Sequence, residues 1–174
     1  SYKPESNWPY APQAYWTAGP GPAADNALAQ LSLLVSIQTD LLDTHPQIDA
    51  GSQLSAEAML RIIPTGADEV HEELLPAGTH SIDPTSAACV LWRLADCPLS
   101  YAEFVPASDF RRLTIDCQPN AKCETTWQLF AEFLEKGVIR RARIHAALLP
   151  RENDVQLAAT WSRHVEQRPL PLTT

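Results

Sequence analysis

The stretch from Phe110 to Gln167 constrains the fold more than any other part of the chain, because nearly every segment in it carries a start or stop signal. Arg111–Asp116 alternates apolar with polar residues, which predicts a half-buried strand. Val138–Leu149 alternates in the same way over a longer run. We therefore expect two strands here, with one further element between them.

The segment between these strands has the signals of a helix. Thr125-Thr126-Trp127-Gln128 has the form of a capping box, and Gly137 suits the left-handed residue that ends a helix. An apolar stripe at helical spacing lies between these signals, made of Trp127, Phe130, Ala131 and Leu134. A second helix is expected from Asn153, which has Gln156 three residues later. A strand, a helix and a strand in this order predict a right-handed crossover between parallel strands.

The first half of the chain has the pattern of short strands separated by turns. Asp25–Leu42 fits both an amphipathic helix and a strand, and the β-branched pair Val35 and Ile37 favours a strand over 31–39. The other expected elements are strands at 58–63 and 87–94, a hairpin made of 69–75 and 79–82, and loops at 43–56 and 95–109.

Together these elements predict an α+β fold. We expect a mixed, mostly antiparallel sheet with a C-terminal β-α-β-α unit and helices on one face. The length of 174 residues fits a single domain with extensions. The expected division is an arm at 1–23, a single α+β domain at 24–168 and an extended C-terminal tail at 169–174.

The arm is rich in proline and in aromatic residues. Its five prolines exclude a helix and a central strand. A purely disordered tail would be poor in aromatic residues. The aromatic side chains therefore indicate an arm that packs on a surface, either its own domain or a neighbouring subunit. The residues predicted to bind a partner are Trp8, Tyr10, Tyr15 and Trp16.

Charge is divided unevenly along the chain. Residues 1–90 hold eleven acidic and two basic side chains, whereas residues 91–174 hold ten and eleven. Two interpretations stay open: the acidic half packs against the more basic half, or the molecule has two poles used for docking. Because the chain lacks a strong cationic footprint, we expect no nucleic-acid partner. No apolar run is long enough to predict a membrane span.

Arginines on the expected strands are the main candidates for a ligand site. Arg112 lies on one strand, and Arg141, Arg143 and His145 share one face of another. Guanidinium groups bind carboxylates and phosphates, and histidine can transfer a proton near neutral pH. The four residues therefore predict an anion-binding face. The alternative is a solvent-facing sheet surface whose arginines pair with acidic residues.

Other signatures of chemistry are absent from the sequence. His71, His80 and the nearby acidic residues lack the spacing of a metal site, and no glycine-rich phosphate loop or serine elbow is present. We therefore predict no metal and no cofactor. Cys117 and Cys123 bracket a short loop, where either a local disulfide or two reduced thiols would fit.

The leading functional hypothesis is a non-enzymatic subunit or interaction module. It would dock on a protein partner or on a second copy of the chain through its extended ends. The alternative is an enzyme or binder of a small anionic ligand, phosphate or carboxylate, at the arginine-bearing sheet face. Whether the protein is an enzyme is left open by the sequence.

Overall fold

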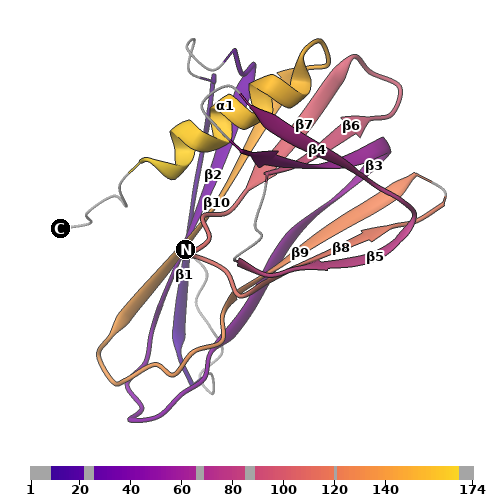
Figure 1. The fold of residues 1–174 in the computed structure, drawn as a ribbon. Coiled ribbons are helices and arrows are strands. Elements are labelled where there is room, and N and C mark those ends of the chain that lie inside the picture. The colour runs from indigo at the N-terminus through magenta and orange to yellow at the C-terminus, as the bar shows by residue number, and fades with distance from the viewer. Residues whose placement is uncertain (1–8, 22–25, 66–68, 85–88, 120, 169–174) are drawn as a thin grey trace.

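The computed structural model describes residues 9–21, 26–65, 69–84, 89–119 and 121–168. They form ten strands and one helix (Figure 1). In chain order the elements are β1 (Ala11–Gly19), β2 (Ala29–Gln38), β3 (Gln47–Pro64), β4 (Val70–Leu75), β5 (Gly78–Ile82), β6 (Cys89–Leu94), β7 (Leu99–Phe104), β8 (Arg112–Cys117), β9 (Lys122–Phe130), β10 (Ile139–Pro150) and α1 (Asp154–Glu166).

All ten strands belong to one antiparallel sheet with the order β1-β2-β10-β7-β6-β3-β9-β8-β5, and β4 pairs with β3. The long strand β3 joins the two halves of this sheet. Its first half pairs with β9, and its second half pairs with β6 and β4. The sheet therefore folds over along β3, so that β9, β8 and β5 lie opposite the other strands (Figure 1).

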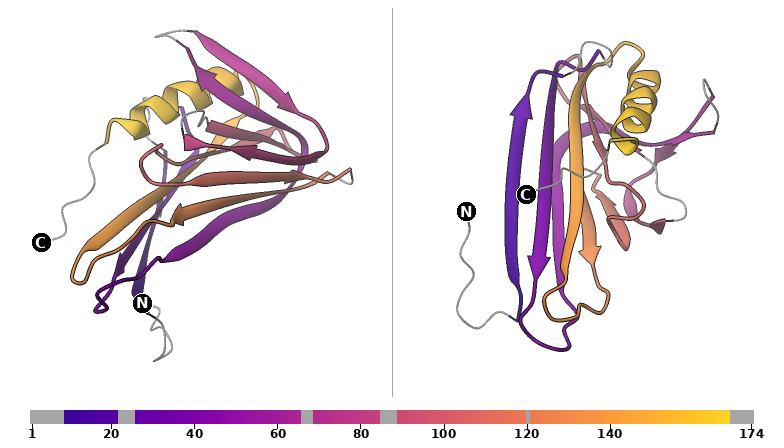
Figure 2. Two further views of the ribbon diagram at one scale, coloured as in Figure 1. Left: turned by 60° about the horizontal axis from the view of Figure 1, so that its bottom comes forward. Right: turned by 90° about the vertical axis from the view of Figure 1, so that its left-hand side faces the viewer.

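Two apolar cores follow from the alternation of side chains along the strands. One fills the space between the halves of the sheet and contains the buried indoles of Trp92 and Trp127. The other lies between the opposite face of the sheet and α1, and includes Trp161. The helix lies to one side of β1, β2 and β10 in Figure 2.

A buried carboxylate fastens the start of α1 to the sheet. Asp154 is 2% exposed and accepts hydrogen bonds from Arg93 Nε and Nη2 at 2.9 and 3.0 Å. It also accepts one from Ser100 Oγ at 2.7 Å. Burial raises the pKa of this carboxyl, but hydrogen bonds from Arg93 and Ser100 outweigh burial and lower it overall. The helix is thus positioned by polar contacts at its start and by apolar contacts along one face.

The predicted α+β class is wrong, because the described residues contain no β-α-β-α unit and α1 is their single helix. The helix expected from Thr125 is strand β9, which pairs with β3 and β8. Its residues alternate inward at period two, with Cys123, Thr125, Trp127 and Leu129 buried. Phe130 and Ala131 have φ of 62° and 125°, which end the strand. Pairing on both sides outweighed the local helical signals.

The second helix begins where it was predicted, and β10 confirms the strand expected at 138–149. However, Asn153 has a left-handed conformation and makes no side-chain capping hydrogen bond. The predicted loop at 43–56 is wrong, because Gln47–Pro64 is a continuous strand. Gly51 is required in it, since a Cβ there would lie 1.7 Å from the carbonyl oxygen of Thr125.

Two further local predictions are corrected by strand pairing. The hairpin predicted from 69–75 and 79–82 does not form, because β4 pairs with β3 and β5 pairs with β8. Residues 95–109 were predicted to be a loop but contain β7, which pairs with β6 and β10. The strand expected at 31–39 lies largely within β2.

Residues 11–19 of the expected arm form β1, which pairs along its whole length with β2. Proline is tolerated there because β1 is the end strand of the sheet. Trp8 and the tail at 169–174 lie outside the described residues. Within the described ranges, no helix has both the length and the apolar character needed to cross a bilayer.

Candidate functional site

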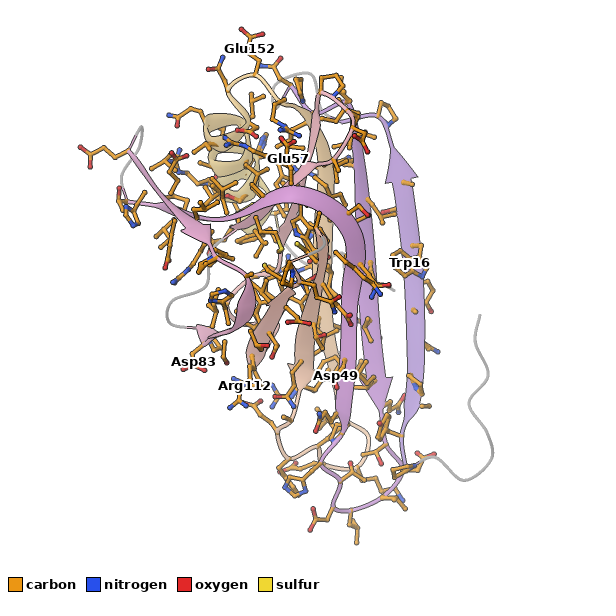
Figure 3. All side chains as sticks on the ribbon, turned by 90° about the vertical axis from the view of Figure 1, so that its right-hand side faces the viewer. Trp16, Asp49, Glu57, Asp83, Arg112 and Glu152 are labelled. Atoms are coloured by element: carbon orange, nitrogen blue, oxygen red, sulfur yellow. The ribbon has the colours of Figure 1, made fainter. Side chains whose placement is uncertain are left out.

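A cavity of about 260 Å³ lies between the two halves of the sheet, at the side where β1 and the first half of β3 form its walls. Figure 3 labels Trp16 on β1 at this side of the molecule. Most of the lining is apolar, and the polar groups are concentrated on β3 and β7. The lining residues are Trp16, Leu31, Leu33, Ala50, Gly51, Ser52, Tyr101, Glu103, Ile144 and Ala146.

The strand alternation explains why these side chains meet. Trp16, Leu33 and Ile144 are direct neighbours across β1, β2 and β10, so they point to the same face. Ala146 pairs with Glu103 across β10 and β7 and extends that face. Trp16 is 62% exposed and therefore stands at the rim, whereas Glu103 is 1% exposed and lies at the base.

Glu103 accepts hydrogen bonds from several strands. Ser52 Oγ donates to Oε1 at 2.7 Å, while Thr125 Oγ1 and Trp127 Nε1 donate to Oε2 at 2.5 and 2.9 Å. The Tyr101 hydroxyl lies 3.5 Å from Oε1 and 3.1 Å from Ser52 Oγ. The carboxyl group is therefore held by β3, β7 and β9 together, and its side-chain rotation is restricted.

The electrostatics of this site favour uncharged forms. Burial raises the pKa of Glu103 and outweighs the opposing hydrogen bonds from Thr125, Trp127, Ser52 and Tyr101. Burial, followed by the nearby Glu103 charge, also raises the pKa of Tyr101, so its phenol stays neutral. The rings of Tyr101 and Trp92 pack in a T-shaped arrangement with 5.8 Å between their centroids, which fixes the hydroxyl at the cavity.

This arrangement supplies a carboxyl group and two hydroxyls at the base of an apolar recess. Such groups exchange hydrogen bonds with a polar ligand, while the recess removes its apolar surface from water. Glu103 and Tyr101 are the titratable side chains among the described lining residues. No histidine or cysteine lines the described cavity to act as a base or nucleophile.

The four residues of the predicted anion-binding face are only partly brought together. Arg141, Arg143 and His145 share the helix-side face of β10, away from the cavity. Arg112 is on β8, which four strands separate from β10 in the sheet order (Figure 3 labels Arg112). Asp109 Oδ2 accepts hydrogen bonds from the backbone N–H and from Nε of Arg143 at 3.0 and 2.9 Å. Arg143 Nη1 also donates to the carbonyl of Arg168 at 2.8 Å.

His145 is buried near Arg143, and its Nδ1 lies 2.8 Å from Ser32 Oγ. Burial, followed by the neighbouring charges of Arg143 and Arg168, lowers the pKa of His145 to about 4. Because the folded protein disfavours protonation of this ring, stability should fall as pH decreases from about 6.5 to about 4. A shift of this size corresponds to about 3 kcal/mol.

We expect His145→Asn to remove this part of the acid sensitivity. Urea unfolding near pH 7 and near pH 4.5 measures the difference for each protein. His45→Asn, at an exposed position before β3, is the matched control and should behave as the wild type. An equal loss of stability in the wild type and His145→Asn would contradict the prediction.

The aromatic residues of the expected arm lie in different settings. Tyr10 donates a hydrogen bond to the carbonyl of Gln47 at 3.1 Å, which connects the start of β1 to β3. Tyr15 and Trp16 are 53% and 62% exposed on opposite faces of β1. Their predicted role in binding a partner stays a prediction.

All four cysteines are free thiols, so the local disulfide is not formed. Cys117 and Cys123 lie directly opposite each other in the pairing of β8 with β9.

Comparisons with known proteins identify a fold likeness. No protein-family model matches the sequence, and no curated protein matches it. Among solved structures, a putative aldose 1-epimerase from Klebsiella pneumoniae has a TM-score of 0.53 and 11% identity over 99% of this chain and 57% of that one. A GH36 alpha-galactosidase from Geobacillus stearothermophilus has a TM-score of 0.45 and 5% identity over 70% of this chain and 20% of that one. The matched region therefore spans just over half the length of the epimerase and about a fifth of the length of the galactosidase.

The polar residues of the cavity were not predicted from the sequence. Ser52, Tyr101 and Glu103 all fell in segments that were predicted to be loops. The available signal was the alternation of Ser100, Ala102 and Phe104 with Tyr101 and Glu103, which marks a strand. Apart from Tyr101, two residues away, the hydrogen-bond partners of Glu103 are between 22 and 51 residues away in sequence, so the network has no local motif.

Proposed function

We propose that this protein is a binding domain for a small uncharged, hydroxyl-bearing molecule, which it holds in the cavity between β1 and β3. The observation that carries the proposal is the buried Glu103 carboxyl group with Ser52 and Tyr101 at the base of an apolar recess. A volume of about 260 Å³ is at the low end for ligand pockets and suits a molecule of few rings.

An aldose sugar is the first ligand to test. Its hydroxyls would exchange hydrogen bonds with the polar base, and its apolar ring face would pack on the indole of Trp16. An uncharged ligand is favoured because burial makes a charge costly at this position, and the same burial raises the pKa of Glu103. The fold likeness to a putative aldose 1-epimerase supports the choice of aldoses as probes.

The test is calorimetric titration with glucose, galactose and xylose, using inorganic phosphate as the anionic comparison. We expect an aldose to bind and Trp16→Ala to weaken binding at least about tenfold, which corresponds to about 1.4 kcal/mol. Tyr15→Ala is the matched control, because it removes another exposed aromatic side chain from the other face of β1. The proposal is wrong if no aldose binds, or if the two substitutions have equal effects.

The two functions predicted from the sequence are not excluded by this proposal. Docking through the chain ends is supported by the exposure of Tyr15 and Trp16 on an end strand. Binding of an anion at the arginine face has weaker support, because the Arg143 guanidinium already bonds to Asp109 and to a backbone carbonyl. Phosphate binding that depends on Arg141 would favour the anion site over the cavity.

A further inference from the structure

Strand β1 presents an unprotected edge. Within the described ranges it pairs with β2 alone and ends the strand order, so its other edge carries backbone groups without a strand partner. The strand is nine residues long and most of its side chains are exposed. None of the residues from Ala11 to Gly19 is charged.

The other edge strands, β4 and β5, have features that normally discourage pairing between sheet edges. β5, at the opposite end of the sheet order, is only five residues long. β4 is six residues long and carries Glu72 and Glu73. Short length and edge charges are known protections against association through a sheet edge. Pro12 offers such protection near the start of β1, which leaves the part from Gln13 to Gly19 open.

We propose that the β1 edge binds the β1 edge of a second copy of this chain, antiparallel, with the two-fold axis at Trp16. The uncharged strand is where two molecules of net charge −8 can approach with the least repulsion. In the sequence around Trp16, Gln-Ala-Tyr-Trp-Thr-Ala-Gly, an alanine lies two residues to either side of the tryptophan. Antiparallel pairing about Trp16 therefore places Ala14 opposite Ala18 of the partner subunit.

The same register places Tyr15 opposite the partner's Thr17, an aromatic side chain against a β-branched one, which is a favourable cross-strand pair. Trp16 lies opposite the partner's Trp16 and loses much of its 62% exposure. The sheets of the two copies become continuous, and the backbone groups of both edges gain partners. This interface does not depend on the ligand proposed for the cavity.

The register can be tested with charges at positions 14 and 18, which are both exposed. In the double variant Ala14→Lys/Ala18→Lys, pairing would place like charges opposite each other twice. In the matched variant Ala14→Glu/Ala18→Lys, the same pairing would place opposite charges together twice. Both variants alter the same two alanines, so effects of size and exposure are shared between them.

Sedimentation velocity of the full chain from about 1 µM to about 1 mM measures the dimer dissociation constant. We expect a wild-type dimer, at least about tenfold weaker association for the lysine–lysine variant, and recovery for the glutamate–lysine variant, with unchanged circular dichroism spectra. A wild-type monomer throughout the range would overturn the proposal. A dimer unaffected by both variants, or equally weakened by both, would overturn the proposed edge and register.

Discussion

Replacing Glu103 with alanine is expected to lower the free energy of unfolding by about 3–5 kcal/mol. The substitution leaves a void in the core and removes the acceptor for Ser52, Thr125 and Trp127. The two hydroxyls can turn toward other acceptors. The indole N–H of Trp127, a residue with no exposed surface, is fixed by its ring and would remain buried without a partner.

Glu103→Gln is the matched variant, because it preserves volume and one acceptor oxygen. That oxygen can still accept from Thr125 and Trp127, while the amide N–H groups face the hydroxyls of Ser52 and Tyr101, which can accept. We expect a loss of only about 1 kcal/mol. Urea unfolding of both variants at one pH measures the contrast. If both variants lost similar amounts of unfolding free energy, the hydrogen-bond network around Glu103 would not be the cause of the loss.

The wild type and Glu103→Gln should also differ in how their stability depends on pH. Because the pKa of Glu103 is raised in the folded state, its contribution to stability is fully present below the ordinary glutamate pKa near 4.5. That contribution decreases as pH rises through the folded-state value. Glu103→Gln should lack this decrease. The change of stability with pH due to Glu103 has the opposite sign to that expected for His145. The two residues can therefore be distinguished by unfolding curves measured at several pH values.

Replacing Asp154 with alanine is the second change with a large expected effect, about 3 kcal/mol of lost stability. Asp154 is buried, and its loss leaves the Ser100 hydroxyl, which has no exposed surface, without its acceptor. The Arg93 side chain is 33% exposed, so its guanidinium can partly recover its hydration. Because of this exposure, we expect a loss of stability at the lower end of the range for breaking a buried ion pair.

Because Asp154 is the first residue of α1 and holds the helix to Arg93 and Ser100, hydrogen exchange of the helix amides should also become faster in Asp154→Ala. Glu152→Ala is the control, since it removes an exposed acidic residue just before the helix (Figure 3). Urea unfolding measures the stability, and exchange measures the docking of the helix. An equal effect of Glu152→Ala would indicate a general charge effect at the helix start rather than the contact with Arg93 and Ser100.

The strands with one clear alternation were predicted from the sequence, whereas the segment around Trp127 was wrongly predicted to be a helix. The run around Arg141 and Arg143 has one dominant pattern, and β10 follows it. The run around Trp127 fits both a helix and a strand, and the outcome depended on β3 and β8, which lie on either side. Residues 43–56 were predicted to be a loop, but in the folded chain Gly51 allows β3 to approach Thr125 closely. Such tertiary contacts have no local signature.

The candidate site was less predictable than the strands for a related reason. Arginines are conspicuous in a sequence, yet the Arg143 guanidinium is satisfied by Asp109 and Arg168. A single glutamate such as Glu103 is inconspicuous, because most glutamates are exposed. Its importance comes from burial next to residues on three strands, which is a property of the folded sheet.

The passage of β3 through both halves of the sheet affects how the protein can move. Gln47–Ser55 pairs with β9 and Ala56–Pro64 pairs with β6 and β4, so the two halves share one continuous backbone segment. Hinge motion between the halves would require bending this strand and breaking the hydrogen bonds from Thr125 and Trp127 on β9 to Glu103 on β7. The cavity between them should therefore behave as a rigid, preformed recess whose access depends on side chains at its rim, with Trp16 foremost among them.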